Sequence, residues 1–140
     1  MAMGSNAKTE LIKSAPLFEH CSKGDLAKIA KIADELDVRA GKVLIAEGER
    51  GREFFVIVTG EVEVRRQGRK LATLGPGNFF GEMALLSKIP RTATVTALTP
   101  LDVLVITDRA FVDLLDKMPS LWPKVARALA ERVVHDDPTR

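Results

Sequence analysis

The sequence of 140 residues has one cysteine and two histidines, and it lacks any long apolar run. A single cysteine excludes an internal disulfide framework and is typical of a reducing compartment, so we expect a cytoplasmic protein. The two histidines, His20 and His135, leave little for a histidine-based metal centre. No stretch approaches the ~18 apolar residues that a membrane helix needs, and no signal peptide opens the chain.

The chain also has little excess charge of either sign. Its net charge is +2 and its pI is about 8.8, with acids and bases interspersed, which is too mild for a nucleic-acid surface. Hydrophobic residues make up 46% and charged residues 29%, so neither a disordered nor a membrane class fits. A chain of this length can bury one core without metals or disulfides. We expect one domain at residues 11–135, with flexible segments at 1–10 and 136–140.

A helical period opens and closes this domain. Residues 1–8 show no periodicity and predict a frayed end. From Ser22 to Leu36 apolar residues recur at three- and four-residue steps, which predicts a helix with Ser22 as its cap and Asp25 in its first turn. The pair Leu17-Phe18 before it predicts an apolar contact that packs this helix against a larger body.

Two more helices are predicted near the end of the chain. Asp108 is expected to cap the first, which Pro119 stops, and Ser120 to cap the last, which extends to Val133.

Between these helices the period changes to that of strands. Short runs rich in Val, Ile, Thr and Phe alternate with glycine turns, and Gln67-Gly68 occupies the place of a tight hairpin turn. This pattern predicts an α+β protein with an antiparallel jelly-roll barrel between terminal helices, because no room is left for helices between the strands. The expected strands are Lys42 to Ala46, Glu53 to Thr59, Glu61 to Arg66, Arg69 to Leu74, Thr92 to Leu98 and Leu101 to Ile106.

One segment interrupts the strands with a pattern suited to an anion. Gly81 followed by Glu-Met-Ala-Leu-Leu predicts a short helix whose first-turn N–H groups, at Met83 and Ala84, face a ligand. Arg91 could close over the same anion with charge-assisted hydrogen bonds. Glu82 would repel a phosphate, but it would accept hydrogen bonds from a sugar hydroxyl. These groups together describe a site for a ribose phosphate.

The residues from Phe80 to Leu86 and from Pro90 to Val95 resemble the phosphate-binding cassette of cyclic nucleotide-binding domains. That family includes the sensor domains of the catabolite activator protein, of protein kinase A regulatory subunits and of cyclic nucleotide-gated channels, and the resemblance extends over roughly Leu17 to Val133. The sequence departs from the family at Gly51-Arg52, where Gly-Asp is common. We attach little weight to this difference because the turn lies away from the cassette.

The resemblance implies a role for each matched residue. Glu82 would bind the ribose 2′-hydroxyl, Arg91 the exocyclic phosphate, and Thr92 the phosphate or the amino group of a guanine. The last helix would move over the base as a lid, with Trp122, Arg127, Leu129 and Arg132 as candidates for base contact. The implied ligand-binding set is Val64, Leu74, Phe80, Gly81, Glu82, Met83, Ala84, Arg91, Thr92 and Ala93.

Several of these features have simpler explanations. Glu82 and Arg91 could form a structural ion pair, and Phe79-Phe80 fits a core better than base stacking. His20-Cys21 suggests a nucleophile, although a cap or core role is simpler, and His135-Asp136-Asp137 fits a polar tail better than a metal site. The basic run Arg65–Lys70 fits a solvated hairpin better than a nucleic-acid patch.

Three functions compete. The sequence favours a regulatory module that senses cAMP, with cGMP as the alternative ligand and no other cofactor. A domain of the same fold with an empty cup would instead serve protein contacts. A metal-dependent enzyme is disfavoured because both histidines lie outside the strands. Only Asp136 to Arg140 follow the last helix, so we expect no direct DNA binding by this chain and an effector on a partner protein or on a missing domain.

Overall fold

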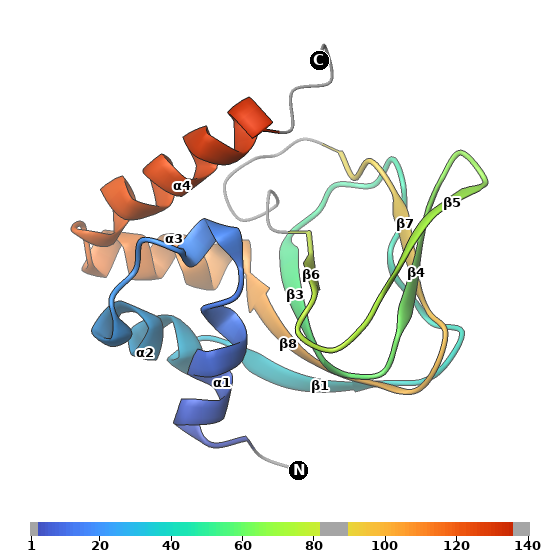
Figure 1. Cartoon of the computed structure of the whole chain (residues 1–140), viewed down its shortest axis with the longest axis horizontal. Coiled ribbons are helices and arrows are strands. Elements are labelled where there is room, and N and C mark those ends of the chain that lie inside the picture. Colours follow the sequence, from blue (N-terminus) through green and yellow to red (C-terminus); the bar gives the residue numbers. More distant parts are fainter. Residues whose placement is uncertain (1–2, 82–89, 136–140) are drawn as a thin grey trace.

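The computed structural model describes residues 3–81 and 90–135, which form two antiparallel sheets and a layer of helices (Figure 1). One four-stranded sheet has the order β1-β8-β3-β6 and the other β2-β7-β4-β5. The first sheet consists of β1 (Asp34–Val38), β8 (Leu101–Thr107), β3 (Glu53–Thr59) and β6 (Phe79–Phe80). The second consists of β2 (Val43–Ile45), β7 (Thr94–Ala97), β4 (Val62–Arg66) and β5 (Arg69–Leu74).

The helices gather on one side of the first sheet, and the second sheet lies on the other side (Figure 1). They are α1 (Ser5–Ile12), the 3₁₀ helix η1 (Pro16–Phe18), α2 (Lys23–Lys31), α3 (Asp108–Lys117) and α4 (Leu121–His135). The predicted α+β jelly-roll fold with terminal helices is confirmed. Among the described residues the two sheets form an open sandwich rather than a closed barrel. The short helix predicted after Gly81 lies within residues 82–89, outside the described residues.

The two faces of the first sheet explain why its strand β3 is apolar without interruption from Phe54 to Val58. Phe54 and Val56 of β3 face a cluster shared with the helices, whereas Phe55 and Ile57 face a cluster shared with the second sheet. A strand covered on both faces has no reason to alternate polar and apolar residues. β4 is covered on one face, and its residue types do alternate: Val62 and Val64 pack in the cluster between the sheets, whereas Arg65 is exposed.

The hairpin between β4 and β5 was predicted correctly. Gln67 and Gly68 both have positive φ, at 51° and 78°. This is the geometry of a type I′ turn, whose twist matches that of the flanking strands.

Two predictions at the start of the chain are wrong. A helix, α1, begins at Ser5 where a frayed end was expected, because tertiary contacts stabilise it. Ile12 at its end is fully buried, and Lys8 Nζ donates to the carbonyl of Ala33 at 2.8 Å. The predicted helix from Ser22 to Leu36 ends at Lys31, and β1 follows it and pairs with β8.

The predicted caps were correct for α2 and displaced for α3. Ser22 accepts from the backbone N–H of Asp25, and the Asp25 carboxylate accepts from the N–H of Ser22, which makes a full capping box. For α3 the cap is Thr107 rather than Asp108, since the Thr107 hydroxyl accepts from Ala110 N–H at 3.2 Å.

Candidate functional site

The backbone of Arg91 is fixed against the loop that joins β2 to β3. Its N–H donates to the carbonyl of Glu49 at 2.7 Å, and its carbonyl accepts from Gly48 N–H at 2.8 Å. Pro90 just before it forms a β-bridge with Arg50. These contacts fix the position of the backbone from which the Arg91 side chain extends.

The guanidinium of Arg91 lies in a cradle of backbone carbonyls. One terminal nitrogen donates to the carbonyl of Glu53 at 2.7 Å, and the other donates to that of Gly81 at 3.3 Å. Burial lowers the pKa of the Arg91 guanidinium, and the charge of Glu53 opposes this shift. An arginine nevertheless stays protonated in proteins, so the site holds a half-buried cation.

Two glycines leave the space that this cation occupies. A Cβ on Gly51 would lie 2.2 Å from Arg91 Nε, which no real side chain tolerates. A Cβ on Gly81 would lie 2.7 Å from an Arg91 terminal nitrogen, and the φ of Gly81 is +81°. The expectation that the Gly51-Arg52 turn lies away from the cassette is therefore wrong, and sequence reasoning missed Gly51 as part of the site. The available signal was that the glycine of Gly51-Arg52 matches the family even though its neighbour does not.

Three residues of the implied ligand-binding set belong to the cluster between the two sheets. Phe80 of β6 is buried and stacks on Phe55 of β3, with ring centroids 4.9 Å apart and planes at 20°. Val64 and Leu74 of the second sheet pack against the same cluster. The structure therefore brings Phe80, Val64 and Leu74 into one apolar region, with Gly81 and Arg91 at the end of β6.

Of the remaining predicted residues, the structure describes only Thr92 and Ala93. Thr92 is exposed, and its carbonyl accepts from Arg66 Nε at 3.0 Å, while Ala93 is half-buried. Glu82, Met83 and Ala84 lie outside the described residues. The suggested Glu82–Arg91 ion pair lies there too.

Comparison with known proteins identifies the family of this fold. A profile described as "Cyclic nucleotide-binding domain" matches residues 35–118, more than half of the chain, including Gly51, Gly81 and Arg91. The chain belongs to the cyclic nucleotide-binding domain family.

Relatives of this cyclic nucleotide-binding domain come from proteins of several kinds. A cAMP-dependent protein kinase regulatory subunit of Mycosarcoma maydis is 37% identical over 84% of this chain and 24% of its own length. A putative potassium channel protein of Rhodopseudomonas palustris is 31% identical over 87% of this chain and 30% of its own. The chain thus spans about a quarter of the length of these curated relatives.

Solved structures agree with this assignment. The N-terminal domain of a transcriptional regulator from Streptomyces coelicolor superposes with a TM-score of 0.82 at 29% identity, over 93% of this chain and 94% of that one. The catabolite activator protein of Thermus thermophilus superposes with a TM-score of 0.72 at 27% identity, over 88% of this chain and 60% of that one.

The structure also tests the simpler explanations within the domain. Phe79 packs edge-on against Phe54 at 6.0 Å, so a core role is confirmed for both Phe79 and Phe80. Burial raises the pKa of the Cys21 thiol to about 11, with the charge of Asp25 adding to the effect. The thiol is therefore protonated at neutral pH, which argues against a nucleophile there.

The lid candidates on α4 are only partly placed. Trp122 and Arg127 are exposed on this helix, and the side chains of Leu129 and Arg132 lie outside what is described.

Within residues 3–81 and 90–135, no helix is both long and apolar enough to cross a bilayer.

Proposed function

We propose that this domain binds a cyclic nucleotide, with cAMP preferred over cGMP, and that binding changes the position of α4. The observation on which the proposal rests is the half-buried Arg91 cation, held by the Glu53 and Gly81 carbonyls where Gly51 and Gly81 leave room for it. A half-buried cation with a fixed position is a good receptor for a phosphate, because little reorganisation is needed on binding.

The roles that the family resemblance implies assign each part of the ligand to a residue. Arg91 and the N–H groups of Gly81, Met83 and Ala84 bind the cyclic phosphate, and Glu82 accepts from the ribose 2′-hydroxyl. Val64 and Leu74 line the base side, and Phe80 supports it through its stack on Phe55. Thr92 and Ala93 complete the site, and a guanine amino group at Thr92 is the route by which cGMP would bind.

We further propose a regulatory rather than an enzymatic role in the cytoplasm, with no cofactor other than the nucleotide. The relatives named above are a kinase regulatory subunit, a channel and a transcriptional regulator. The response would be passed to an effector protein or a further domain, without direct DNA binding by residues 1–140.

The test is a calorimetric titration of the purified chain with cAMP, cGMP and 5′-AMP. We expect saturable binding of cAMP, weaker binding of cGMP, and much weaker binding of 5′-AMP, which lacks the cyclic phosphate. If the folded protein bound none of the three nucleotides, the proposal would be overturned in favour of a domain of the same fold that binds no nucleotide and serves protein contacts.

The variant Arg91→Ala tests the site itself. Charge-assisted hydrogen bonds contribute roughly 1.5–3 kcal/mol each, so cAMP affinity should fall by at least ~10-fold. The matched control is Arg69→Ala, which removes an exposed arginine at the β4–β5 hairpin and should leave affinity unchanged. Circular dichroism checks that both variants fold. A folded Arg91→Ala protein with unaltered affinity would exclude the phosphate role of Arg91.

A further inference from the structure

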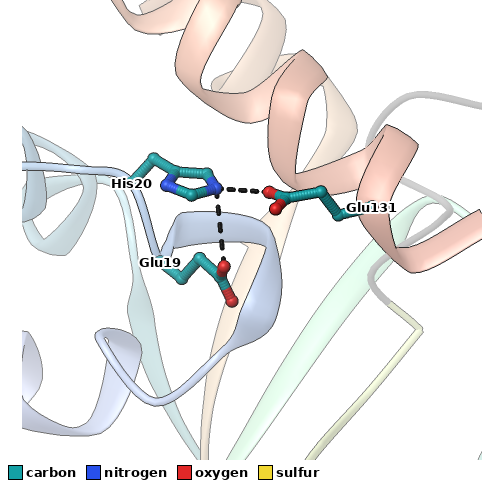
Figure 2. A group of neighbouring side chains, drawn as sticks. All are labelled: Glu19, His20 and Glu131. Atoms are coloured by element: carbon teal, nitrogen blue, oxygen red, sulfur yellow. Dashed lines mark hydrogen bonds and ion pairs between the residues drawn. The ribbon is translucent and has the colours of Figure 1, made fainter. Parts of the chain in front are cut away.

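Three metal-ligating side chains meet where the 3₁₀ helix η1 contacts α4 (Figure 2). Glu19 and His20 follow η1 directly, and Glu131 comes from the C-terminal half of α4. His20 Nε2 lies 2.5 Å from Glu131 Oε1 and 3.4 Å from Glu19 Oε1. The three ligand atoms all lie within 4.8 Å of one another. Residues 111 positions apart in the sequence thus face one point.

Both elements that supply these side chains are anchored in the core. Leu17 and Phe18 of η1 are 1% exposed, and they fix the two residues that follow them. On α4, Leu121 and Val125 are buried in the same cluster, and Ala128 is buried one turn further on. A second contact, from Lys124 Nζ to the Asp25 carboxylate at 2.5 Å, ties α4 to the start of α2.

The distances suit a transition-metal ion. Zinc binds His nitrogen and carboxylate oxygen at about 2.0–2.2 Å, so two ligands of a tetrahedral ion lie about 3.4 Å apart. The separation of His20 Nε2 from Glu19 Oε1 is 3.4 Å. The Glu131 carboxylate has to withdraw from its present 2.5 Å by about 0.9 Å. It can do so by rotating, because its side chain is 47% exposed.

The chemistry of the three groups selects the kind of ion. Two carboxylates and a neutral imidazole balance the charge of a divalent cation. An imidazole ligand favours zinc and its transition-metal neighbours over magnesium and calcium, which prefer oxygen alone. Waters would complete the coordination, since Glu19 is also exposed, at 54%.

We propose that Glu19, His20 and Glu131 bind one Zn²⁺ ion, which links α4 to η1. The proposal does not depend on cyclic nucleotide binding. Arg127 competes for one ligand, because its Nε lies 3.9 Å from Glu131 Oε1. An ion pair between two exposed side chains one helical turn apart contributes little in water, so Arg127 is a weak competitor for a metal ion.

The test is a titration of ZnCl₂ into the chain after removal of metals with EDTA. We expect one saturable zinc site in the wild type. Zinc should bind at least ~10-fold more weakly to His20→Gln and to Glu131→Gln, because the loss of even an outer-shell partner of a metal ligand lowers metal affinity by that factor. The matched controls are Glu10→Gln, which removes an exposed carboxylate on α1, and His135→Gln, which removes the other histidine. Both should bind zinc as the wild type does.

A second readout reports on the link between the two elements. An ion that binds only the folded state raises the unfolding temperature, so zinc should stabilise the wild type and leave His20→Gln unchanged. Proton NMR assigns the zinc ligand. The ring signals of His20 are identified by their absence from the His20→Gln spectrum, and zinc should shift these signals in the wild type. Wild-type zinc affinity in a folded His20→Gln protein, or no saturable binding by the wild type, would overturn the site and leave an ion pair.

Discussion

At the scale of single residues, Gly51 has the most specific role in the site, although its own chemistry is inert. Its φ is ordinary, so a replacement would meet no backbone strain. The cost of a side chain there is steric, because its Cβ would lie 2.2 Å from Nε and 2.4 Å from Cζ of Arg91. Arg91 would have to leave the two carbonyls that orient it.

We therefore predict that Gly51→Ala weakens cAMP binding by at least ~10-fold, the loss expected when a charge-assisted hydrogen bond is misaligned. Gly75→Ala is the matched control, since nothing lies within 4 Å of a Cβ at that glycine and its φ is not positive. Calorimetry of the two variants beside the wild type measures the difference. Equal cAMP affinity in Gly51→Ala and Gly75→Ala would show that the position of the guanidinium does not matter.

At the scale of elements, the pairing of β1 with β8 sets two carboxylates side by side. Asp37 lies opposite Asp102 in the ladder, and Thr59 Oγ1 donates to Asp102 Oδ2 at 3.0 Å. The hydrogen bond to Asp102 and its charge raise the pKa of Asp37, whereas hydrogen bonds from Asp37 and Thr59 lower the pKa of Asp102. The proton thus resides on Asp37 when the pair holds one.

The sign of the pH dependence follows from these two directions. A raised pKa in the folded state gives Asp37 a stabilising contribution at low pH, which is lost as the pH rises through that pKa. The lowered pKa of Asp102 does the opposite, giving stability that is lost as the pH falls. Above both pKa values, two like charges face each other across the ladder, which is destabilising.

We predict that Asp37→Asn raises the free energy of unfolding at about pH 7 and changes it less at about pH 4, near the ordinary aspartate pKa. The amide keeps a donor for Asp102 and removes one charge. Asp34→Asn is the control, because Asp34 is exposed on the same strand and lies opposite Val105. Urea unfolding at the two pH values provides the measurement, and a gain no larger at neutral pH would contradict the shared-proton account.

The elements also show what could be predicted from the sequence. Local signals succeeded where the cause is local, as for the Gln67-Gly68 turn and the Ser22 capping box. They failed for β1, whose Leu36 continues a helical period although it is 46% exposed in a strand. Pairing with β8, about 70 residues away, decides that segment, and no local pattern contains this information.

The candidate site shows the same division. Arg91 and Gly81 were identified from the motif, because the chemistry of an anion site is visible in the residue types. Gly51 and the carbonyl of Glu53 were not, since their roles depend on a side chain from a distant loop. The Glu19–His20–Glu131 cluster was missed for the same reason: Glu131 is separated from His20 by the whole of both sheets.

At the scale of the whole molecule, the first sheet separates two clusters with different neighbours. The cluster between the sheets contains Phe80 and borders the proposed nucleotide site. The cluster on the other face holds the helices, with Phe18, Phe54 and Phe111 at its centre and Leu121 and Val125 of α4 packed into it. Phe79 and Phe80 are adjacent in β6 but face opposite clusters. A movement of β6 would therefore change side-chain packing on both sides of the sheet.

This arrangement makes α4 the element on which a response to the nucleotide should be visible. We predict that cAMP changes the hydrogen-exchange rates of amides in α4, while α3, which packs directly on β8, keeps its rates and acts as the internal control. The first turns of α4 should change least, because the buried Leu121 and Val125 and the Lys124–Asp25 ion pair hold them. The measurement is exchange followed by mass spectrometry of peptides from α3 and α4, with Arg91→Ala as the variant that cannot respond. Identical exchange rates in α4 with and without saturating cAMP would contradict the proposed change in the position of α4. The domain would then bind the nucleotide without passing the signal through this helix.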